Sequence, residues 1–226
     1  MKHLIETADS SGLAITEYDR LILNSTTNDV IVKGGGYEYV DLGLSVKWAK
    51  CNVGAEKETD AGLYFAWGET TGYTASQVGT DKQFSWSDYK YGNSSNLTKY
   101  NQSDRKTVLE STDDAATQIM GSDWRMPTQT EWHELLNNTD KLWTTINEVN
   151  GYKFTSKING NSIFIPAAGL YSNGSVGNVG SYGSVWSSSL YTSNPGRAWY
   201  LGFDSGNCGV GNYYRCGGRS VRGVRK

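Results

Sequence analysis

Apolar and polar residues alternate along several short stretches of the chain, which is the pattern of half-buried β-strands. In the clearest stretch, Trp199, Leu201 and Phe203 occupy alternate positions, so their side chains point to one side of the strand. We expect these residues in the core and the residues of opposite parity in solvent. The strands predicted after the first 36 residues are 39–44, 46–49, 152–155, 162–166, 185–190, 198–203 and 220–224.

Two other segments carry the signals of helices. Residues 113–120 begin with two acidic residues, which suit the positive end of a helix dipole, and are followed by Gly121. The second helix opens at Pro127, where Thr128 and Glu131 have the spacing of a capping box. Its apolar stripe, which we expect in the core, consists of Trp132, Leu135 and Leu136.

The first 36 residues differ from the rest of the chain. They contain two short β-like runs, 21–23 and 30–32, with a turn predicted at 24–29 and a glycine linker at 34–36. Because so small a piece cannot bury its own apolar faces, we expect it to dock on another copy or on a larger assembly. The expected units are an N-terminal attachment or oligomerisation segment, 1–36, and a ligand-binding domain, 37–226.

Charge and composition exclude several classes of protein. The formal net charge is −2, from 21 Lys and Arg against 23 Asp and Glu, so we expect no nucleic-acid partner. With 8 Trp and 15 Tyr the chain is too aromatic to be disordered. No stretch approaches the roughly 20 apolar residues of a membrane span, and a secretory signal is missing, so we expect no membrane insertion. The protein is then cytoplasmic, released by lysis or assembled into a particle.

Side chains that carry catalysis or bind metals are few. The 2 histidines are His3 and His133, and none of the 3 cysteines lies in a CxxC motif, so we expect no metal and no cofactor. Residues 186–190 do not form the GxSxG turn of a nucleophilic serine, and the glycines at 34–36 lack the Lys and Ser/Thr of a phosphate-binding loop. We therefore predict no catalytic residue. A disulfide between Cys208 and Cys216 stays open.

The stretch 191–218 stands out by its composition. Tyr, Ser, Asn, Asp, Arg, Cys and Gly fill the positions expected to be exposed, as in an antibody paratope, where Tyr gives contact area at low entropy cost. A Gly-rich edge of a β domain with ordinary surface tyrosines explains the composition equally well. The predicted ligand-binding residues are Tyr191, Ser193, Gly196, Arg197, Tyr200, Gly202, Asp204, Asn207, Cys208, Asn212, Tyr213, Tyr214 and Cys216.

Several separated motifs resemble those of a known family. They are YVDLGLSVKWA at 39–49, YFAWGET at 64–70, WRMPT at 124–128 followed by Glu131 and Trp132, GNSIF at 160–164, PAAG at 166–169, WSSSL at 186–190 and SVR at 220–222. Together they resemble the Fibrobacter succinogenes major paralogous domain over residues 37–226. The resemblance implies an α+β, C-type-lectin-like fold, with two helices packed on short antiparallel sheets and many loops, related to formylglycine-generating enzymes.

The same resemblance implies a function. The fold hosts variable proteins of diversity-generating retroelements, whose C-terminal strands and loops carry randomised positions. The implied protein is a non-enzymatic receptor-binding adhesin of a Bacteroides-type phage or prophage, whose partner is a host cell-surface protein or glycan. We expect it in the virion, as part of the phage tail, with the bacterial cell surface as the alternative. We also expect a homo-oligomer, and a trimer stays open.

Two other functions remain as alternatives. A formylglycine-generating type of oxidase would need a copper-binding cysteine pair, for which Cys208 and Cys216 are the candidates, although their spacing does not match the expected pattern. An undiversified carbohydrate-binding surface module would differ from the adhesin only in its genomic context.

Overall fold

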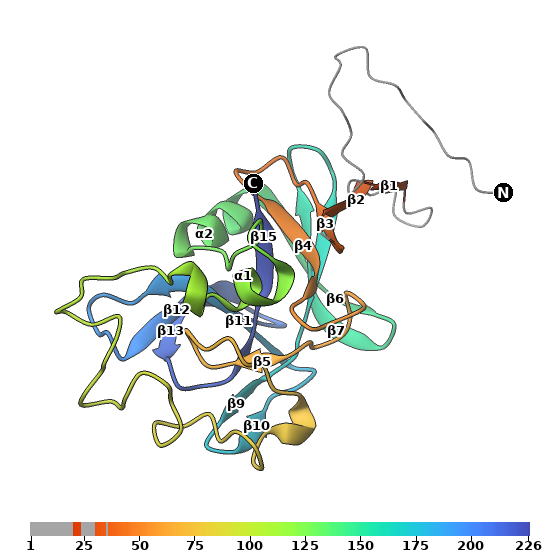
Figure 1. The fold of residues 1–226 in the computed structure, drawn as a ribbon. Coiled ribbons are helices and arrows are strands. Elements are labelled where there is room, and N and C mark those ends of the chain that lie inside the picture. Colours follow the sequence, from red (N-terminus) through yellow and green to blue (C-terminus); the bar gives the residue numbers. More distant parts are fainter. Residues whose placement is uncertain (1–19, 24–29, 35) are drawn as a thin grey trace.

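The computed structural model describes residues 20–23, 30–34 and 36–226, and in these residues β-strands dominate. The first sheet has the order β1-β2-β3-β4-β15 and joins strands from both ends of the chain (Figure 1). Its neighbouring strands are antiparallel. Their bounds are Arg20–Leu23 for β1, Val30–Gly34 for β2, Tyr37–Val40 for β3, Lys47–Asn52 for β4 and Arg222–Arg225 for β15.

The second sheet carries the stretch singled out by its composition. Its order is β13-β12-β11-β14-β5, with β13 at the edge, and only the β11–β14 pair is parallel among these described strands. The bounds are Tyr64–Phe65 for β5, Tyr182–Leu190 for β11, Arg197–Asp204 for β12, Cys208–Tyr214 for β13 and Arg219–Ser220 for β14.

Two smaller sheets and the helices complete the fold. The three-stranded sheet contains β6 (Thr139–Ile146), β7 (Val149–Ser156) and β8 (Ser162–Pro166), and the two-stranded sheet β9 (Leu170–Ser172) and β10 (Ser175–Gly177). The α-helices are α1 (Ala115–Met120) and α2 (Gln129–Asn138), and the 3-10 turns are η1 (Ala75–Gln77) and η2 (Ser111–Asp113).

The expected α+β, C-type-lectin-like arrangement is wrong. Helix α1 has 6 residues and α2 has 10, and strands grouped in several small sheets make up most of the regular structure of the described chain. The physical reason is that strand pairing extends beyond the predicted stretches. Residues 139–146 and 208–214 form full strands that the alternation pattern did not indicate, because few of their side chains are buried.

Both predicted helices are present, and each begins two residues later than predicted. Asp114 caps α1 by accepting a hydrogen bond of 2.9 Å from the Thr117 amide. The capping box of α2 is confirmed, because Thr128 Oγ1 accepts from the Glu131 amide and the Glu131 carboxylate accepts from the Thr128 amide. The stripe on α2 is buried, as predicted, and joins a core cluster that also contains residues of the first, second and three-stranded sheets. In this cluster Trp132 and Trp48 have ring centroids 4.8 Å apart.

The division at residue 36 stays a prediction. The strands predicted at 21–23 and 30–32 are present as β1 and β2, and β2 pairs with β3 in the first sheet. The predicted turn at 24–29 and residue 35 of the predicted linker lie outside the described residues. None of the helices in the described ranges is long and apolar enough to cross a bilayer.

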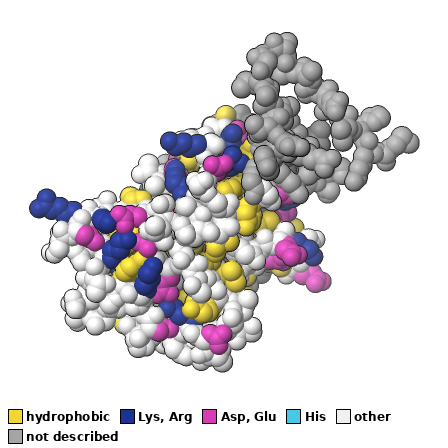
Figure 2. Space-filling model, viewed as in Figure 1, with side chains coloured by type: hydrophobic (Ala, Val, Ile, Leu, Met, Phe, Trp, Pro, Cys, Tyr) yellow, Lys and Arg dark blue, Asp and Glu magenta, His cyan; other side chains and the backbone are white. Residues whose placement is uncertain are grey.

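The segment between β5 and α1 has little regular structure, yet it is fixed by buried aromatic rings. Phe84, Tyr89 and Tyr100 join the core cluster that also contains Trp67 and Trp186. On the face shown in Figure 2, hydrophobic side chains form a band along the middle of the molecule. Lys and Arg are mixed with Asp and Glu on the side where this segment lies in Figure 1.

Candidate functional site

The β12–β13 pair forms the edge of the second sheet, and its register determines which side chains share a face. Tyr200 lies opposite Gly211, and Leu201 lies opposite Val210. Leu201 and Phe203 are buried against the core, which confirms their predicted role. Trp199 is only half-buried, so its assignment to the core is wrong. It lies near the end of the strand, where its ring packs edge-on against Tyr191 with centroids 5.0 Å apart.

The face of opposite parity carries part of the predicted set. We call its exposed and half-buried part the outer face, whose members are Tyr182, Tyr200, Gly202, Asp204, Gly209, Gly211 and Tyr213. Ser184, Trp186 and Ala198 lie on the same side of the sheet but are buried. Tyr213 is 37 % exposed, whereas Tyr200, Gly202 and Asp204 are half-buried. The hydroxyls of Tyr182 and Tyr200 lie 3.1 Å apart. Tyrosine rings and bare glycine backbone therefore meet on one side of the sheet.

Other predicted residues lie elsewhere. Arg197, Asn212 and Tyr214 share the face of Trp199, not that of Tyr200. There Arg197 Nη1 donates to Asn212 Oδ1 over 3.1 Å, and the guanidinium carbon lies 4.7 Å from the centre of the Tyr214 ring. We call these three residues the edge group. Tyr214 is 41 % exposed and also contacts Trp86, with ring centroids 6.1 Å apart. The register along β13 explains the split, because neighbouring residues of a strand point to opposite sides.

Three predictions of exposure are wrong. Gly196 and Cys216 are buried, and Cys208 packs against the core cluster around Phe203. Gly196 and Cys216 lie outside the β12 and β13 strands, so strand parity does not apply to them. Cys208 lies opposite Phe203 in the ladder and shares its inward direction.

The exposed turns at the two ends of β12 hold two more predicted residues. Ser193 lies in the β11–β12 connection and Asn207 in the β12–β13 turn, and both are exposed. Asp204 has a structural task in the second turn, where its Oδ1 accepts hydrogen bonds from the Gly206 and Asn207 amides at 2.8 and 2.9 Å. Without Tyr191, which packs against Trp199, and the three inward residues, the predicted set falls into an outer face, an edge group and two turns.

The sequence analysis missed Arg219, which lies beneath the outer face. Its guanidinium carbon is 4.5 Å from the ring centres of Trp186 and Tyr213 and 4.7 Å from that of Tyr200. The side chain is fully buried, and loss of hydration lowers its pKa to about 10. The signal that could have revealed it is an arginine one residue before Ser220, in a stretch otherwise predicted to be a strand of the core.

The cysteines do not form a reactive pair. Cys51, Cys208 and Cys216 are all free thiols, so the Cys208–Cys216 bridge left open by the sequence is not formed. Burial raises the pKa of Cys208 to about 12 and that of Cys216 to about 11. Thiols with such pKa values are protonated at neutral pH, whereas a nucleophile or metal ligand is a thiolate. No group of three or more His, Cys, Asp or Glu side chains gathers within the described ranges.

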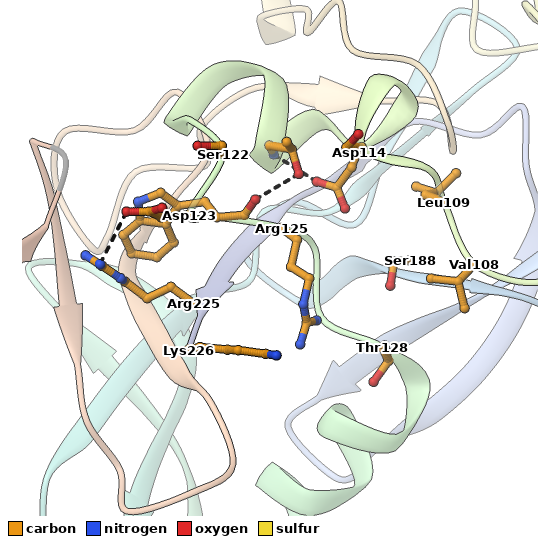
Figure 3. A pocket seen from close by; sticks show the side chains of 13 residues that line it. Val108, Leu109, Asp114, Ser122, Asp123, Arg125, Thr128, Ser188, Arg225 and Lys226 are labelled. Atoms are coloured by element: carbon orange, nitrogen blue, oxygen red, sulfur yellow. Dashed lines mark hydrogen bonds and ion pairs between the residues drawn. The ribbon is translucent and has the colours of Figure 1, made fainter.

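A concave pocket lies away from the β12–β13 edge, between α1, the start of α2 and β15. Its volume is about 580 Å³. Figure 3 shows Arg225 and Lys226 on one side of it and Val108, Leu109 and Ser188 on the other. No residue of this pocket belongs to the set predicted from the sequence.

The acidic groups of the pocket are already engaged in the fold. Asp114 accepts from the Met126 amide at 2.8 Å and caps α1, and Arg125 forms an ion pair with Glu131. Asp123 faces Arg225 at 3.5 Å (Figure 3). Burial raises the pKa of the Asp114 carboxyl, and the hydrogen bonds from the Thr117 and Met126 amides oppose that rise.

Comparison with known proteins gives one match. Residues 134–224 match the family described as a domain of unknown function (DUF8237). This range begins in α2 and ends in β15, so it includes the whole β12–β13 edge and Arg219. No curated protein and no solved structure matches the chain.

Proposed function

We propose that this protein is a non-enzymatic adhesin that binds a ligand on a host-cell surface through the β12–β13 edge of the second sheet. The observation that carries the proposal is the pair Tyr213 and Tyr214 on the edge strand, 37 % and 41 % exposed. Tyrosines with this exposure remove a large area from water when a partner covers them, and they lose little rotamer entropy. Hydrogen-bonding side chains of the edge group and the two turns surround them.

The edge position supports recognition in a second way. A strand at the edge of a sheet presents backbone N–H and C=O groups along its free side, and these can pair with an arriving ligand. The opposite side of β13 is held by a full ladder to β12, from the Arg197–Tyr214 pair to the Phe203–Cys208 pair. The binding side chains therefore stand on a backbone that is already ordered, which lowers the entropic cost of binding.

We further propose that the exposed positions are diversified. Substitutions at exposed sites away from caps and packing change stability by less than about 0.5 kcal/mol, so Ser193 and Asn207 can vary freely. Tyr213 and Tyr214 are also exposed, but their rings contact Arg219 and Trp86, so replacing them changes local packing. Gly202 is different, because a Cβ there would lie 2.5 Å from the Tyr182 hydroxyl oxygen. Asp204 cannot be replaced freely either, because its carboxylate accepts the hydrogen bonds that hold the β12–β13 turn. The neighbouring DNA tests this proposal: a reverse transcriptase and a near-copy of the 3′ coding region that differs at adenines support it, and their absence contradicts it.

The first strands would supply attachment. β1 lies at the edge of the first sheet, at the opposite end of the sheet from β15. We propose that residues 1–36 join the binding domain to other copies in a virion. Light scattering of the full chain should give a homo-oligomer, and a monomer at micromolar concentration would argue against this arrangement.

A binding assay tests the adhesin itself. The labelled full chain is incubated with a panel of intact Bacteroides strains, beside the double variant Tyr213→Ala, Tyr214→Ala. The wild type should bind a subset of the strains, and the double variant should lose that binding while its melting temperature stays within a few degrees. Leu142→Ala on β6 is the matched control, because Leu142 is 60 % exposed and lies in another sheet. Unchanged binding by the double variant would refute the proposal.

A further inference from the structure

Three buried arginines follow one another near the C-terminus, at positions 215, 219 and 222. Arg215 Nη1 donates to the carbonyls of Tyr100 and Pro195 at 2.9 and 3.1 Å, and its Nη2 donates to that of Lys99 at 3.0 Å. The Arg222 Nη1 and Nη2 atoms donate to backbone carbonyls in the same way, and its Nε donates to Asn52 Oδ1 at 3.0 Å. In both residues, oxygen acceptors of the chain replace the water lost on burial.

Arg219 is buried equally deeply, but its donors are not satisfied. Nε and Nη1 have no hydrogen-bond partner. No ion pair to Arg219 is formed by the described residues, so its positive charge is balanced only by the π-faces of Trp186, Tyr200 and Tyr213. Ring faces attract a cation but accept N–H groups weakly. A buried charge with open donors is costly to the folded protein, and an anion would satisfy it.

The outer face offers a short route to this charge. Tyr213 is one of the three rings over the guanidinium, and it stands exposed on the edge strand. The neighbouring outer positions on β13 are Gly209 and Gly211, which carry no side chain, and a Cβ added at Gly209 would meet nothing within 4 Å. The ring of Tyr200 fills the space beside Gly211, and Trp186 is fully buried. Among the three rings, Tyr213 is therefore the one whose rotation would uncover Arg219 from the solvent side. The hydroxyls of Tyr182 and Tyr200 lie on the same face.

We propose that Arg219 is the receptor for a carboxylate group of the ligand, and that the ligand is an acidic sugar. This inference rests on the proposed function and names the ligand chemistry of the same face. The carboxylate displaces the Tyr213 ring and accepts hydrogen bonds from the guanidinium, which is the geometry that arginine and carboxylate share. The sugar ring then lies against the aromatic rings that border the opening.

A sugar suits the surroundings better than an acidic peptide does. Beside Tyr213, the ring of Tyr200 also lies on the Arg219 guanidinium, and its hydroxyl is 3.1 Å from that of Tyr182. A pyranose presents a flat, apolar C–H face with its carboxylate on the rim, so it can place both groups at once. An acidic side chain of a protein brings the carboxylate on a flexible stem and would leave the rings uncovered.

Calorimetric titration of the full chain tests the proposal with two matched pairs of probes. The first pair is 3′-sialyllactose and its methyl ester, and the second is an oligogalacturonate and its methyl ester. Each pair differs by its carboxylate charge, and all titrations use the same ionic strength, about 0.15 M, because salt screens exposed charges. Wild type should bind the acidic member of at least one pair about tenfold more tightly.

The variant Arg219→Met assigns this preference to one residue. Methionine has a similar length and no charge, so it should abolish the preference and leave the melting temperature within a few degrees of wild type. The matched control is Arg105→Met, which removes the same charge from an exposed position and should keep the preference. If Arg219→Met does not fold, Arg219→Gln replaces it, because glutamine removes the charge but keeps a polar side chain. This variant should also abolish the preference, and a preference that it keeps would overturn the proposal.

Every result of these titrations either supports or overturns the proposal. The proposal is overturned if the wild type shows no acid preference for either pair, if Arg219→Met keeps that preference, or if a tetraglutamate peptide binds more tightly than both acidic sugars. Failure of the broader adhesin function would look different. In that case the Tyr213, Tyr214 double variant would retain binding to cells, whatever the sugar titrations give.

Discussion

The Arg215 guanidinium donates a hydrogen bond of 2.8 Å from its Nε to the Tyr89 hydroxyl, across 126 positions of sequence. Tyr89 lies in the irregular segment between β5 and α1, and Arg215 directly follows β13. The same guanidinium stacks against Trp67 and Tyr89, with its central carbon 5.1 and 5.2 Å from the ring centres. One side chain therefore ties the long irregular segment to the end of the strand that carries the candidate site.

Replacing Arg215 should strongly destabilise the folded protein. Arg215→Met would leave the Tyr100, Pro195 and Lys99 carbonyls without their donor, and each unsatisfied buried group costs about 1–3 kcal/mol. We expect the free energy of unfolding, measured by urea denaturation, to fall by about 3 kcal/mol or more. Arg105→Met, at an exposed position, should change it by less than about 0.5 kcal/mol. Equal effects of the two substitutions would contradict this account.

Arg219→Met should behave in the opposite way to Arg215→Met. No acceptor loses a donor when Arg219 is removed, because its Nε and Nη1 have none. The loss of attraction to the rings is offset by relief of a buried charge, and replacement of buried charges by apolar side chains is often neutral. We expect a change of less than about 1 kcal/mol in the same urea experiment. A loss as large as that of Arg215→Met would show that the rings alone stabilise the cation.

Two glycines of the second sheet make a matched pair. A Cβ at Gly183 would lie 1.9 Å from Cζ of Phe203, inside the core, whereas one at Gly209 meets nothing within 4 Å. Gly183→Ala should lower the free energy of unfolding by about 1–3 kcal/mol or more through overpacking. Gly209→Ala should be neutral or stabilising by up to about 1 kcal/mol, because glycine is unfavourable inside a strand. Thermal unfolding of both variants checks the strand register. A strand shifted by one residue would turn Gly183 outward, and Gly183→Ala would then no longer be the less stable variant.

Acid should weaken the segment before α1 through Asp113. Burial alone would raise the pKa of Asp113, but hydrogen bonds from Lys99 and Tyr100 and the charge of Lys90 lower it from 3.8 to about 2. A depressed folded-state pKa stabilises the fold above pH 3.8, and this contribution is lost as the pH falls from 3.8 to about 2. Asp113→Asn should be less stable than wild type at pH 6, and the difference should shrink across that window. Urea midpoints at several pH values would measure it, and a constant difference would contradict the assignment.

The thiols should be unreactive in the folded protein. Burial raises the pKa of Cys51, Cys208 and Cys216, so the reactive thiolate is scarce at neutral pH. We expect the native chain to react with a thiol-specific disulfide reagent at least about tenfold more slowly than the chain in denaturant. Fast reaction of Cys208 or Cys216 in the native state would instead favour an oxidase with a thiolate pair.

The sequence predicts a helix or strand correctly where its buried residues recur at one regular spacing. The capping residues Thr128 and Glu131 and the stripe on α2 follow local rules, and so do the buried positions Leu201 and Phe203. Local rules were insufficient for β6 and β13, because most of their side chains are exposed or half-buried. The resemblance of separated motifs then implied an α+β fold that the arrangement of strands into small sheets contradicts.

The sequence by itself determined that this chain is a folded, aromatic-rich protein with a Tyr, Asn and Gly composition near its C-terminus. Only the tertiary structure decided which of these residues meet. The β12–β13 register divides the strand residues between two faces. Packing outside these two strands buries Gly196 and Cys216 and brings Arg219 of β14 against the rings of Tyr200 and Tyr213. The physical reason is that periodicity records the burial of each residue along its own strand. The pairing of strands that are distant in sequence depends on how all their buried faces pack at once.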